Sequence, residues 1–258
     1  MNNKIAVISG GLGDIGYEIA LTFGKQGIKV AISDLAGEEQ AEARLEKLRS
    51  NGCSDLFYQK VDVSSETEVL AWLNAVEKKW GIPQIIIPNA GTVVSGALTG
   101  EEIKTDDVRN QIDVNFWGSY YMAVHGAKKM KENALPGRIV FIGSWAAERP
   151  NARISSYCIS KAAVRMLCKS LALELASDDI LVNEIAPGIV EGGLSKKNQQ
   201  KNPELLKIHL NSIPANKLVP VEEVAHHVLN MADFSFNNVT GTTLVVDGGI
   251  SLTSKMTR

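Results

Sequence analysis

Short runs of β-prone residues alternate with longer amphipathic patterns along almost the whole chain, and this alternation constrains the fold more than any other feature. Strands that are separated by helices need crossover connections, which place the strands parallel in one sheet and the helices on both of its faces. The pattern predicts strands at residues 5–8, 28–33, 56–61, 85–87, 138–142, 180–185 and 243–246. It predicts helices at residues 14–26, 36–50, 66–80, 107–131, 155–177 and 221–233. We therefore expect an α/β, doubly wound, mostly parallel sheet of about seven strands.

Nothing in the sequence divides the chain into separate domains. It has no linker rich in proline, glycine or serine and no internal repeat, and α/β domains of about 250 residues are common. We expect one domain over residues 1–258. The least regular stretch runs from Pro187 to Pro220, where glycines and prolines interrupt the pattern. Long irregular insertions in α/β proteins are usually functional, so we expect a substrate loop at about 188–215.

Composition narrows the possible partners. The 27 basic and 29 acidic residues give a net charge of -2, and no basic run is long enough to follow a nucleic-acid backbone. Cys53, Cys158 and Cys168 have no metal-ligand spacing and read as reduced thiols, so we expect no metal and a cytoplasmic protein. No apolar stretch reaches the length of a membrane span, and we expect no membrane association.

A glycine-rich segment, Ser9 to Gly16, joins the first expected strand to the first expected helix. Glycines allow positive φ and a close approach of the backbone to a pyrophosphate, which the amides of the helix N-terminus can bind. This arrangement is typical of the Rossmann type of doubly wound fold. A tight strand-to-helix turn needs glycines in any case, so a purely structural turn is the alternative. The residues expected to contact the nucleotide are Gly10, Gly11, Gly13, Asp14 and Ile15.

An acidic residue, Asp34, ends the second expected strand, eighteen residues after Gly16. A carboxylate at this place can accept hydrogen bonds from the adenosine ribose and would repel a 2′-phosphate. No arginine adjoins it, which favours NAD over NADP. The alternative is that Asp34 only caps the helix expected near Ala36.

Further along, an ordered set of motifs strongly resembles the short-chain dehydrogenase/reductase family over nearly the whole chain. Tyr157-x-x-x-Lys161 occurs by chance in many helices, but here Ser144 precedes Tyr157 by thirteen residues. The remaining motifs are Val61-Asp62-Val63, Asn89-Ala90-Gly91, Asn115, Pro187-Gly188 and Val246-Asp247-Gly248-Gly249. The order and spacing of the set make the resemblance specific.

The resemblance implies four catalytic residues. Tyr157 would exchange a proton with the substrate hydroxyl, and Ser144 would hold the substrate oxygen. Lys161, one helical turn after Tyr157, would bind the nicotinamide ribose, and Asn115 would position a water next to it. A neighbouring ammonium and the cationic nicotinamide would both lower the tyrosine pKa from about 10. The alternatives are that Tyr157 is a packed aromatic residue, that Ser144 is a strand-end cap, and that Asn115 is a polar residue inside a helix.

The resemblance also implies the remaining cofactor contacts and the assembly. NAD is the expected cofactor, with NADP less favoured. A homo-oligomer, a tetramer or dimer, is expected by analogy, with the helices at 107–131 and 155–177 packing across subunits. The further cofactor-binding residues would be Asp62, Val63, Asn89, Ala90, Gly91, Tyr157, Lys161, Pro187, Gly188, Ile189 and Val190.

Four positions depart from the family pattern. Asp14 stands where the middle glycine of the turn is expected, and it would cap the helix or reach a ribose hydroxyl. Pro88 replaces an asparagine and cannot donate a backbone hydrogen bond. Gly143 replaces a serine just before Ser144. Gly192 stands where a threonine often binds the nicotinamide carboxamide, so Ser195, backbone groups or a different loop order would replace that contact.

The substrate is less defined than the cofactor. Trp145 would stack on a substrate or pack under the loop, and Arg149 and Arg153 would bind an anionic substrate or form surface ion pairs or subunit contacts. We expect an NAD(H)-dependent oxidoreductase that acts on a secondary alcohol or ketone of the sugar, polyol or hydroxy-acid type. The alternatives are an NADH-using 3-oxoacyl reductase and a non-catalytic dinucleotide sensor.

Overall fold

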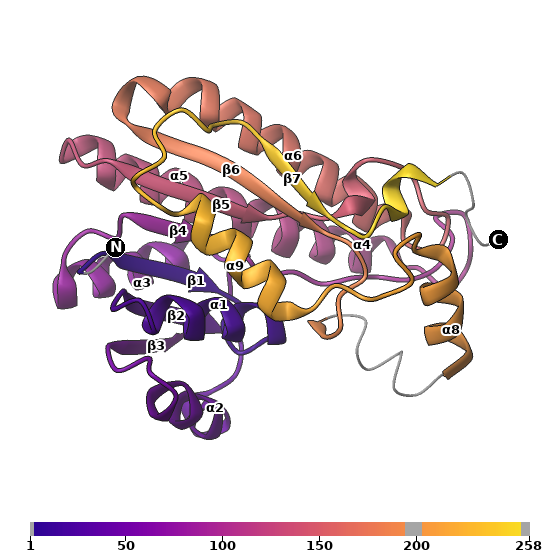
Figure 1. Ribbon diagram of the computed structural model, residues 1–258, viewed down its shortest axis with the longest axis horizontal. Helices are drawn as coiled ribbons and strands as arrows, with labels where there is room; N and C mark the ends of the chain where they lie inside the picture. Colours follow the sequence, from indigo (N-terminus) through magenta and orange to yellow (C-terminus); the bar gives the residue numbers. More distant parts are fainter. Residues whose placement is uncertain (1–2, 194–202, 254–258) are drawn as a thin grey trace.

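The computed structural model describes residues 3–193 and 203–253. Its centre is a seven-stranded parallel sheet in the order β3-β2-β1-β4-β5-β6-β7 (Figure 1). The strands are β1 (Ile5–Ser9), β2 (Lys29–Asp34), β3 (Leu56–Lys60), β4 (Ile85–Ile87), β5 (Gly137–Ile142), β6 (Ile180–Pro187) and β7 (Thr243–Val246). The expected doubly wound parallel sheet is confirmed, with strand ends within two residues of the predicted ones.

Helices cover both faces of the sheet (Figure 1). The α-helices are α1 (Asp14–Gly24), α2 (Glu38–Ser50), α3 (Glu66–Trp80), α4 (Thr105–Ile112), α5 (Gly118–Glu132), α6 (Ser155–Leu175), α8 (Pro203–Ser212) and α9 (Val221–Met231). No helix in the described parts of the chain is long and apolar enough to cross a membrane.

The apolar core consists of two layers because each strand sends alternate side chains to opposite faces. In β1, Ala6 and Ile8 pack with α1, α2 and α9 on one face. Ile5 and Val7 pack with α3, α5 and α6 on the other face. Both faces of the central strands are therefore buried, which explains why their sequences are continuous apolar runs.

The helix expected at 107–131 is present, but it is not α-helical throughout. That stretch begins two residues earlier, at Thr105, and contains a π-helical segment, η1 (Asp113–Trp117), between α4 and α5. Asp106 and Asp107 occupy the first turn, where carboxylates interact favourably with the helix dipole. π-Helical turns inside α-helices occur frequently at functional sites, and this one contains Asn115.

The stretch expected to form a substrate loop is also more regular than predicted. Residues 203–212 of the interval 188–215 form α8 (Figure 1). Prolines and glycines on either side concealed this helix in the sequence pattern. The middle of the interval, including Ser195, lies outside the described residues.

Candidate active site

The candidate residues gather at the carboxyl ends of the strands, where β1 and β4 lie side by side. The strand order reverses between these two strands, and doubly wound proteins bind ligands at such a point. Asn89, after β4, donates from its amide to the carbonyl oxygens of Ser9 (2.8 Å) and Gly10 (3.2 Å). Ser9 Oγ accepts from the backbone amides of Asn89 and Ala90. The loop after β1 and the loop after β4 are therefore joined, and Asn89 stabilises the glycine turn directly.

The glycine turn leaves a backbone surface at the start of α1. Gly10 has φ +65°, and a Cβ there would lie 3.0 Å from the Cα of Ala90. A Cβ on Gly16 would come within 2.7 Å of the Asn89 amide, whereas one on Gly13 would meet only the Gly10 oxygen, at 3.3 Å. Gly13 is the N-cap of α1 and has no side chain to cap its first amides. A pyrophosphate fits here because Gly13 leaves the helix N-terminus uncovered.

Asp14 does not cap α1, and both of its carboxylate oxygens accept hydrogen bonds from other parts of the protein. It is the first residue of α1, after the N-cap. Its Oδ1 accepts from Arg44 of α2 at 3.2 Å, and its Oδ2 accepts from the backbone amide of Gly193 at 3.1 Å. The expectation of a helix cap was wrong, because the carboxylate instead joins α1 to α2 and to the segment after β6. Gly192 has φ +155°, and a Cβ there would lie 3.3 Å from the Cβ of Asp14.

Asp34 lies at the end of β2 and bonds to the glycine turn. Its Oδ2 accepts from the amide of Leu12 at 3.1 Å, and its Oδ1 accepts from that of Leu35 at 2.8 Å. The alternative, that Asp34 caps the next helix, was wrong because α2 begins at Glu38 with Gly37 as its N-cap. The carboxylate therefore lies beside the turn, where the NAD prediction requires it.

The other predicted cofactor residues surround the same edge of the sheet. Asp62 Oδ1 accepts from the Ser64 amide at 2.9 Å and from its hydroxyl at 2.7 Å, so this carboxylate orders the loop before α3. Val63 is buried, and a Cβ on Gly118 would lie 2.7 Å from it.

Backbone contacts hold the segment after β6 against its neighbours. The Gly188 amide donates to the Val246 oxygen at 2.8 Å. A Cβ on Gly188 would lie 2.6 Å from the Asp247 Cα. Ile189 accepts from the Val219 amide at 2.9 Å, and Val190 pairs with Val219 in an isolated bridge.

The last predicted cofactor residues lie at the glycine turn and at the end of β6. Gly11 lies against β2, and Ile15 packs against the core. Pro187 is the last residue of β6.

The proposed catalytic side chains converge on the end of β5. Tyr157 and Lys161 lie one turn apart on α6, and the Ser144 side chain lies close enough to the Tyr157 hydroxyl to lower its pKa. Ser144 Oγ also accepts from the Ala146 amide at 3.1 Å, as the N-cap of a short 3₁₀ turn, η2 (Trp145–Ala147). Lys161 Nζ donates to the Ile142 oxygen at 2.8 Å and lies 5.7 Å from the centre of the Tyr157 ring.

Burial, rather than Lys161, dominates the pKa of Tyr157 in this structure. Burial raises the pKa of Tyr157 to about 12, and the Ser144 side chain is the contact that lowers it. Burial also lowers the pKa of Lys161 to about 8, which the nearby Glu184 carboxylate partly offsets. The cost of burying a phenolate therefore sets the direction of this shift, and the combined effect of Lys161 and a bound oxidised nicotinamide stays a prediction.

Asn115 is held inside η1 and does not point freely into the site. Its Oδ1 accepts from the Thr92 amide at 2.8 Å, and its Nδ2 donates to the Thr92 oxygen at 3.0 Å and to Ser160 Oγ at 2.9 Å. A Cβ on Gly91 would lie 3.3 Å from Asn115 Oδ1 and 3.8 Å from Lys161 Nζ. Because Gly91 has no side chain, the Asn115 side-chain amide and the Lys161 ammonium can both lie next to its backbone.

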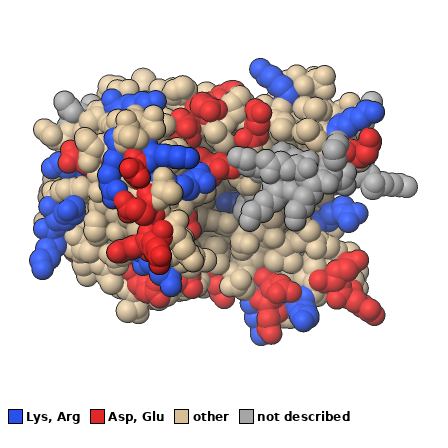
Figure 2. All heavy atoms as spheres, turned by 90° about the horizontal axis from the view of Figure 1, so that it is seen from below, with Lys and Arg blue, Asp and Glu red and all other residues tan. Residues whose placement is uncertain are grey.

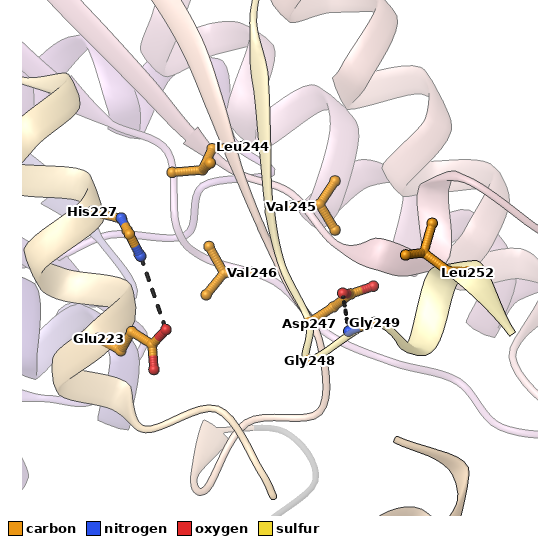
Figure 3. Close-up of a pocket in the computed structure, with 9 residues that line it drawn as sticks. All are labelled: Glu223, His227, Leu244, Val245, Val246, Asp247, Gly248, Gly249 and Leu252. Atoms are coloured by element: carbon orange, nitrogen blue, oxygen red, sulfur yellow. Dashed lines mark hydrogen bonds and ion pairs between the residues drawn. The ribbon is translucent and has the colours of Figure 1, made fainter. Parts of the chain in front are cut away.

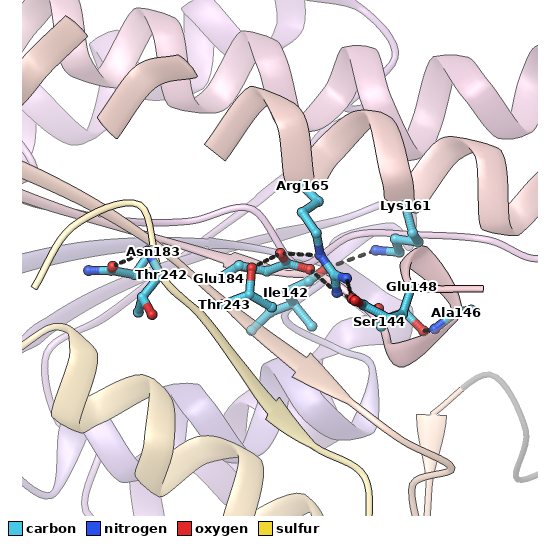
Figure 4. Close-up of polar contacts among 10 residues, drawn as sticks. All are labelled: Ile142, Ser144, Ala146, Glu148, Lys161, Arg165, Asn183, Glu184, Thr242 and Thr243. Carbon is cyan, nitrogen blue, oxygen red and sulfur yellow. Dashed lines mark hydrogen bonds and ion pairs between the residues drawn. The ribbon is translucent and has the colours of Figure 1, made fainter. Parts of the chain in front are cut away.

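Sequence reasoning missed a buried polar network beneath this site (Figure 4). Arg165, the next residue on the α6 face after Tyr157 and Lys161, pairs with Glu184 of β6 through two hydrogen bonds of 2.9 and 3.1 Å. The same guanidinium donates to the Ser144 carbonyl at 2.9 Å. The signal in the sequence was Glu184 itself, a charge in the middle of an otherwise mostly apolar strand.

Of the four predicted substrate residues, Ser144 lies beside Tyr157, and the other three lie on the segment that follows it. Arg149 donates to the carbonyl oxygens of Ser251 (3.0 Å) and Thr253, which ties it to η4 (Ile250–Leu252) near the end of the described chain. Trp145 is the first residue of η2 and is half-buried. The Arg153 oxygen accepts from the Gly96 amide at 2.8 Å, and its side chain is exposed.

A groove also runs along β7 (Figure 3). Its walls are β7, the turn after it, and the side chains of Glu223 and His227 from α9, which are 4.0 Å apart. None of the four proposed catalytic residues lines it. In residues 3–193 and 203–253, no group of three His, Cys, Asp or Glu side chains is arranged to bind a metal.

Comparisons with known proteins agree with this site. The family model described as enoyl-(acyl carrier protein) reductase matches residues 11–251. Glucose 1-dehydrogenase 2 of Bacillus subtilis (strain 168) is 30% identical over 98% of this chain and 96% of its own. The 3-oxoacyl-(acyl-carrier-protein) reductase FabG of Pseudomonas aeruginosa is 31% identical over 97% of this chain and 98% of its own. The solved structure of ElxO with NADP bound has a TM-score of 0.90 at 29% identity, covering 98% and 100% of the two chains.

These matches define a class of protein: Rossmann-fold oxidoreductases that act on a CH–OH group with NAD(P). The chain belongs to the short-chain dehydrogenase/reductase family. The relatives named above act on different substrates at nearly equal identity, so the comparisons leave the substrate and the choice between NAD and NADP open.

Proposed function

We propose that the protein is an NAD(H)-dependent oxidoreductase that interconverts a polar secondary alcohol and its ketone, with Tyr157 as the general acid and base. The observation that carries this proposal is the position of the Ser144 side chain and the Lys161 ammonium beside Tyr157. A non-catalytic dinucleotide sensor would not need these three groups together.

In the proposed mechanism, Ser144 holds the substrate oxygen next to the Tyr157 hydroxyl. In reduction, the phenol O–H bond breaks and its proton goes to the carbonyl oxygen as a new C–H bond forms at the carbonyl carbon. Oxidation reverses both events. Lys161 holds positive charge beside the phenol, and Asn115 fixes the backbone next to that ammonium. When bound, the nicotinamide supplies or accepts the hydride and, in its oxidised form, adds positive charge near the phenol.

NAD is the proposed cofactor because Asp34 lies against the glycine turn. A ribose bound at that turn would meet its carboxylate, which accepts hydrogen bonds from hydroxyls and repels a phosphate. The amides at the start of α1 would hold the pyrophosphate. The NADP in the ElxO structure is a property of that protein, so cofactor choice is the first measurement to make.

The assay is NADH or NADPH formation with a panel of alcohols: D-glucose, a linear polyol and a 2-hydroxy acid. We expect turnover with at least one of them, and a larger kcat/KM with NAD than with NADP. We expect Tyr157→Phe to lose at least about a thousandfold in kcat, while Tyr120→Phe on α5 keeps it. Full turnover in Tyr157→Phe would refute the proposal.

The second candidate is a 3-oxoacyl reductase, which the 31% identity to the Pseudomonas aeruginosa enzyme favours. Among the described residues, acidic and basic side chains are interspersed on the face seen in Figure 2, so the described part of that face offers no broad basic patch for an acyl carrier protein. Acetoacetyl-CoA with NADH tests this candidate. Faster turnover than with any panel substrate would make it the better description.

We propose that the protein assembles as a homo-oligomer through α5 and α6. Ile159, Met166 and Leu173 recur every seven residues on α6 and are 56%, 61% and 87% exposed. Side chains at this spacing form one apolar stripe, and such stripes usually mark a protein interface. Trp117, 40% exposed beside the start of α5, adds to the exposed apolar surface.

A further inference from the structure

We infer that Arg165 is a positioning residue for the reaction: its guanidinium fixes the turn that carries Ser144, so that the serine hydroxyl stays against Tyr157. This inference rests on the proposed roles of Ser144 and Tyr157, and it assigns a role to a residue outside the family's motifs. Figure 4 shows the arrangement, with Arg165 between Glu184 and the turn.

Arg165 is on the same face of α6 as the tyrosine and the lysine. Residues 157, 161 and 165 follow one another at four-residue intervals, so their side chains project from adjacent turns of one helix. A contact from Arg165 to the Ser144 turn therefore fixes that turn relative to the helix that carries Tyr157. The two partners of the proposed hydrogen bond are then held by one rigid element.

The guanidinium contacts both ends of the turn. It donates through Nη2 to the carbonyl oxygen of Ser144, the N-cap of η2, at 2.9 Å. It donates through Nη1 to the carboxylate of Glu148, the C-cap. A turn of three residues that is held at both ends has little freedom to rotate, so the Ser144 side chain keeps its direction.

Glu184 anchors the guanidinium from below. Its side chain is fully buried, and it accepts from Arg165 Nε and Nη2 and from the Thr243 hydroxyl of β7 at 2.7 Å. A side chain on Gly143 would overlap the carboxylate, with its Cβ 2.5 Å from the Glu184 Cδ. Gly143 therefore makes room for Glu184, which explains the glycine at this position.

Stability alone does not explain this pair. Exchanging a buried ion pair for apolar residues of similar size is often neutral or stabilising, because both charges lose their hydration. The chain contains a second buried arginine for comparison. Arg138, at the start of β5, donates to the carbonyl oxygens of Gly137 (2.8 Å) and Phe236 (3.1 Å), far from the catalytic end of that strand. Arg138 organises loops, whereas Arg165 organises the residue that holds the substrate oxygen.

The experiment compares matched variants at the two arginines. Arg165→Lys keeps the charge opposite Glu184, but one ammonium cannot bond to Glu184, the Ser144 carbonyl and Glu148 in the same geometry. Arg165→Met removes the contacts altogether, and Arg138→Lys and Arg138→Met are the controls. The measurements are kcat and KM for the panel alcohol that the wild type oxidises fastest, the Kd of NADH from its fluorescence, and thermal unfolding.

We expect kcat to fall roughly 10- to 100-fold in the Arg165 variants, because small displacements of a reacting group have effects of this size. KM and the NADH Kd should stay within about twofold, since the contacts serve the reacting geometry rather than binding. The Arg138 variants should keep kcat even where their unfolding temperature falls. If Arg165→Met does not fold, Arg165→Lys decides the question.

Three results would overturn the inference. A wild-type kcat in Arg165→Lys would show that the contacts of the Arg165 guanidinium are unnecessary. Equal losses of kcat in the Arg138 variants would show a general effect of buried arginines. A parallel loss of NADH binding would place the defect in the fold of the site rather than in the direction of Ser144. Tyr157→Phe is measured alongside: if it stays active, the proposed function itself fails, whereas an inactive Tyr157→Phe with an active Arg165→Lys removes only this inference.

Discussion

The free-energy cost of burying the Lys161 ammonium can be measured through its pH dependence. Lys161 is 4% exposed, and burial lowers its pKa from 10.5 to about 8 despite the nearby Glu184 carboxylate. Between these two values the unfolded chain binds a proton that the folded protein lacks. Stability from this residue must therefore rise as the pH rises from about 8 toward 10.5, and the full cost remains below pH 8.

The magnitude follows from the two pKa values. A shift from 10.5 to about 8 costs about 3 kcal/mol once the group is fully protonated in both states. Between about pH 6.5 and about pH 9.5, roughly 2 kcal/mol of that cost should disappear. In a chain of this size, 2 kcal/mol corresponds to about 4–8 °C in unfolding temperature.

The perturbation is Lys161→Met, which removes the charge and keeps most of the side-chain volume. We expect the stability of the wild type relative to this variant to increase by about 2 kcal/mol across that pH range. The assay is urea unfolding at several pH values and one protein concentration, since assembly adds to apparent stability. Other groups titrate in both proteins and largely cancel in the difference. A difference that is flat, or that falls as the pH rises, would refute the reasoning.

The remaining predictions concern the cofactor, packing and assembly. Asp34→Ser should raise the ratio of kcat/KM for NADP over NAD by about tenfold or more, because a repulsive charge is lost, and steady-state kinetics with both cofactors will test this. Gly143→Ala should lower the free energy of unfolding by about 1–3 kcal/mol because its Cβ would displace the buried glutamate of β6. Gly37→Ala, where nothing lies within 4 Å of the new Cβ, should cost less than about 1 kcal/mol in the same denaturant assay. Leu173→Lys should reduce the molar mass in solution by light scattering, whereas Phe236→Lys, also at an exposed apolar residue, should leave it unchanged.

Sequence alone was sufficient for the fold because the sheet is parallel and buried on both faces. Its strands are apolar runs and its helices are amphipathic, so period and length separate them. The pattern failed at α8, where Pro203 and nearby glycines concealed the helix. It also failed at η1, because a π-helical segment has nearly the same hydrophobic pattern as the α-helices around it.

The candidate site was predictable where a motif joins neighbouring residues and unpredictable where it depends on burial. Tyr157 and Lys161 are one turn apart in any helix, so their proximity follows from the sequence. The pKa of Tyr157 does not, since it depends on how much water reaches the hydroxyl. Arg165 and Glu184 belong to a helix and a strand that meet only in the folded protein, so their pairing could not be read from their spacing.

The buried charges of the site form one connected system. Lys161 and Arg165 are both cationic and lie one turn apart, and each would disfavour the charge of the other in a medium of low dielectric constant. Glu184 bonds directly to Arg165 and also raises the pKa of Lys161. One buried carboxylate therefore supports the guanidinium that holds Ser144 and the ammonium beside Tyr157. Because Gly143 is the residue that leaves space for this carboxylate, three positions outside the catalytic motif, 143, 165 and 184, are linked by volume and charge. A change at any one of them should act on the geometry of Ser144 or on the charge of Lys161, although Arg165 and Glu184 are not proposed to touch the substrate.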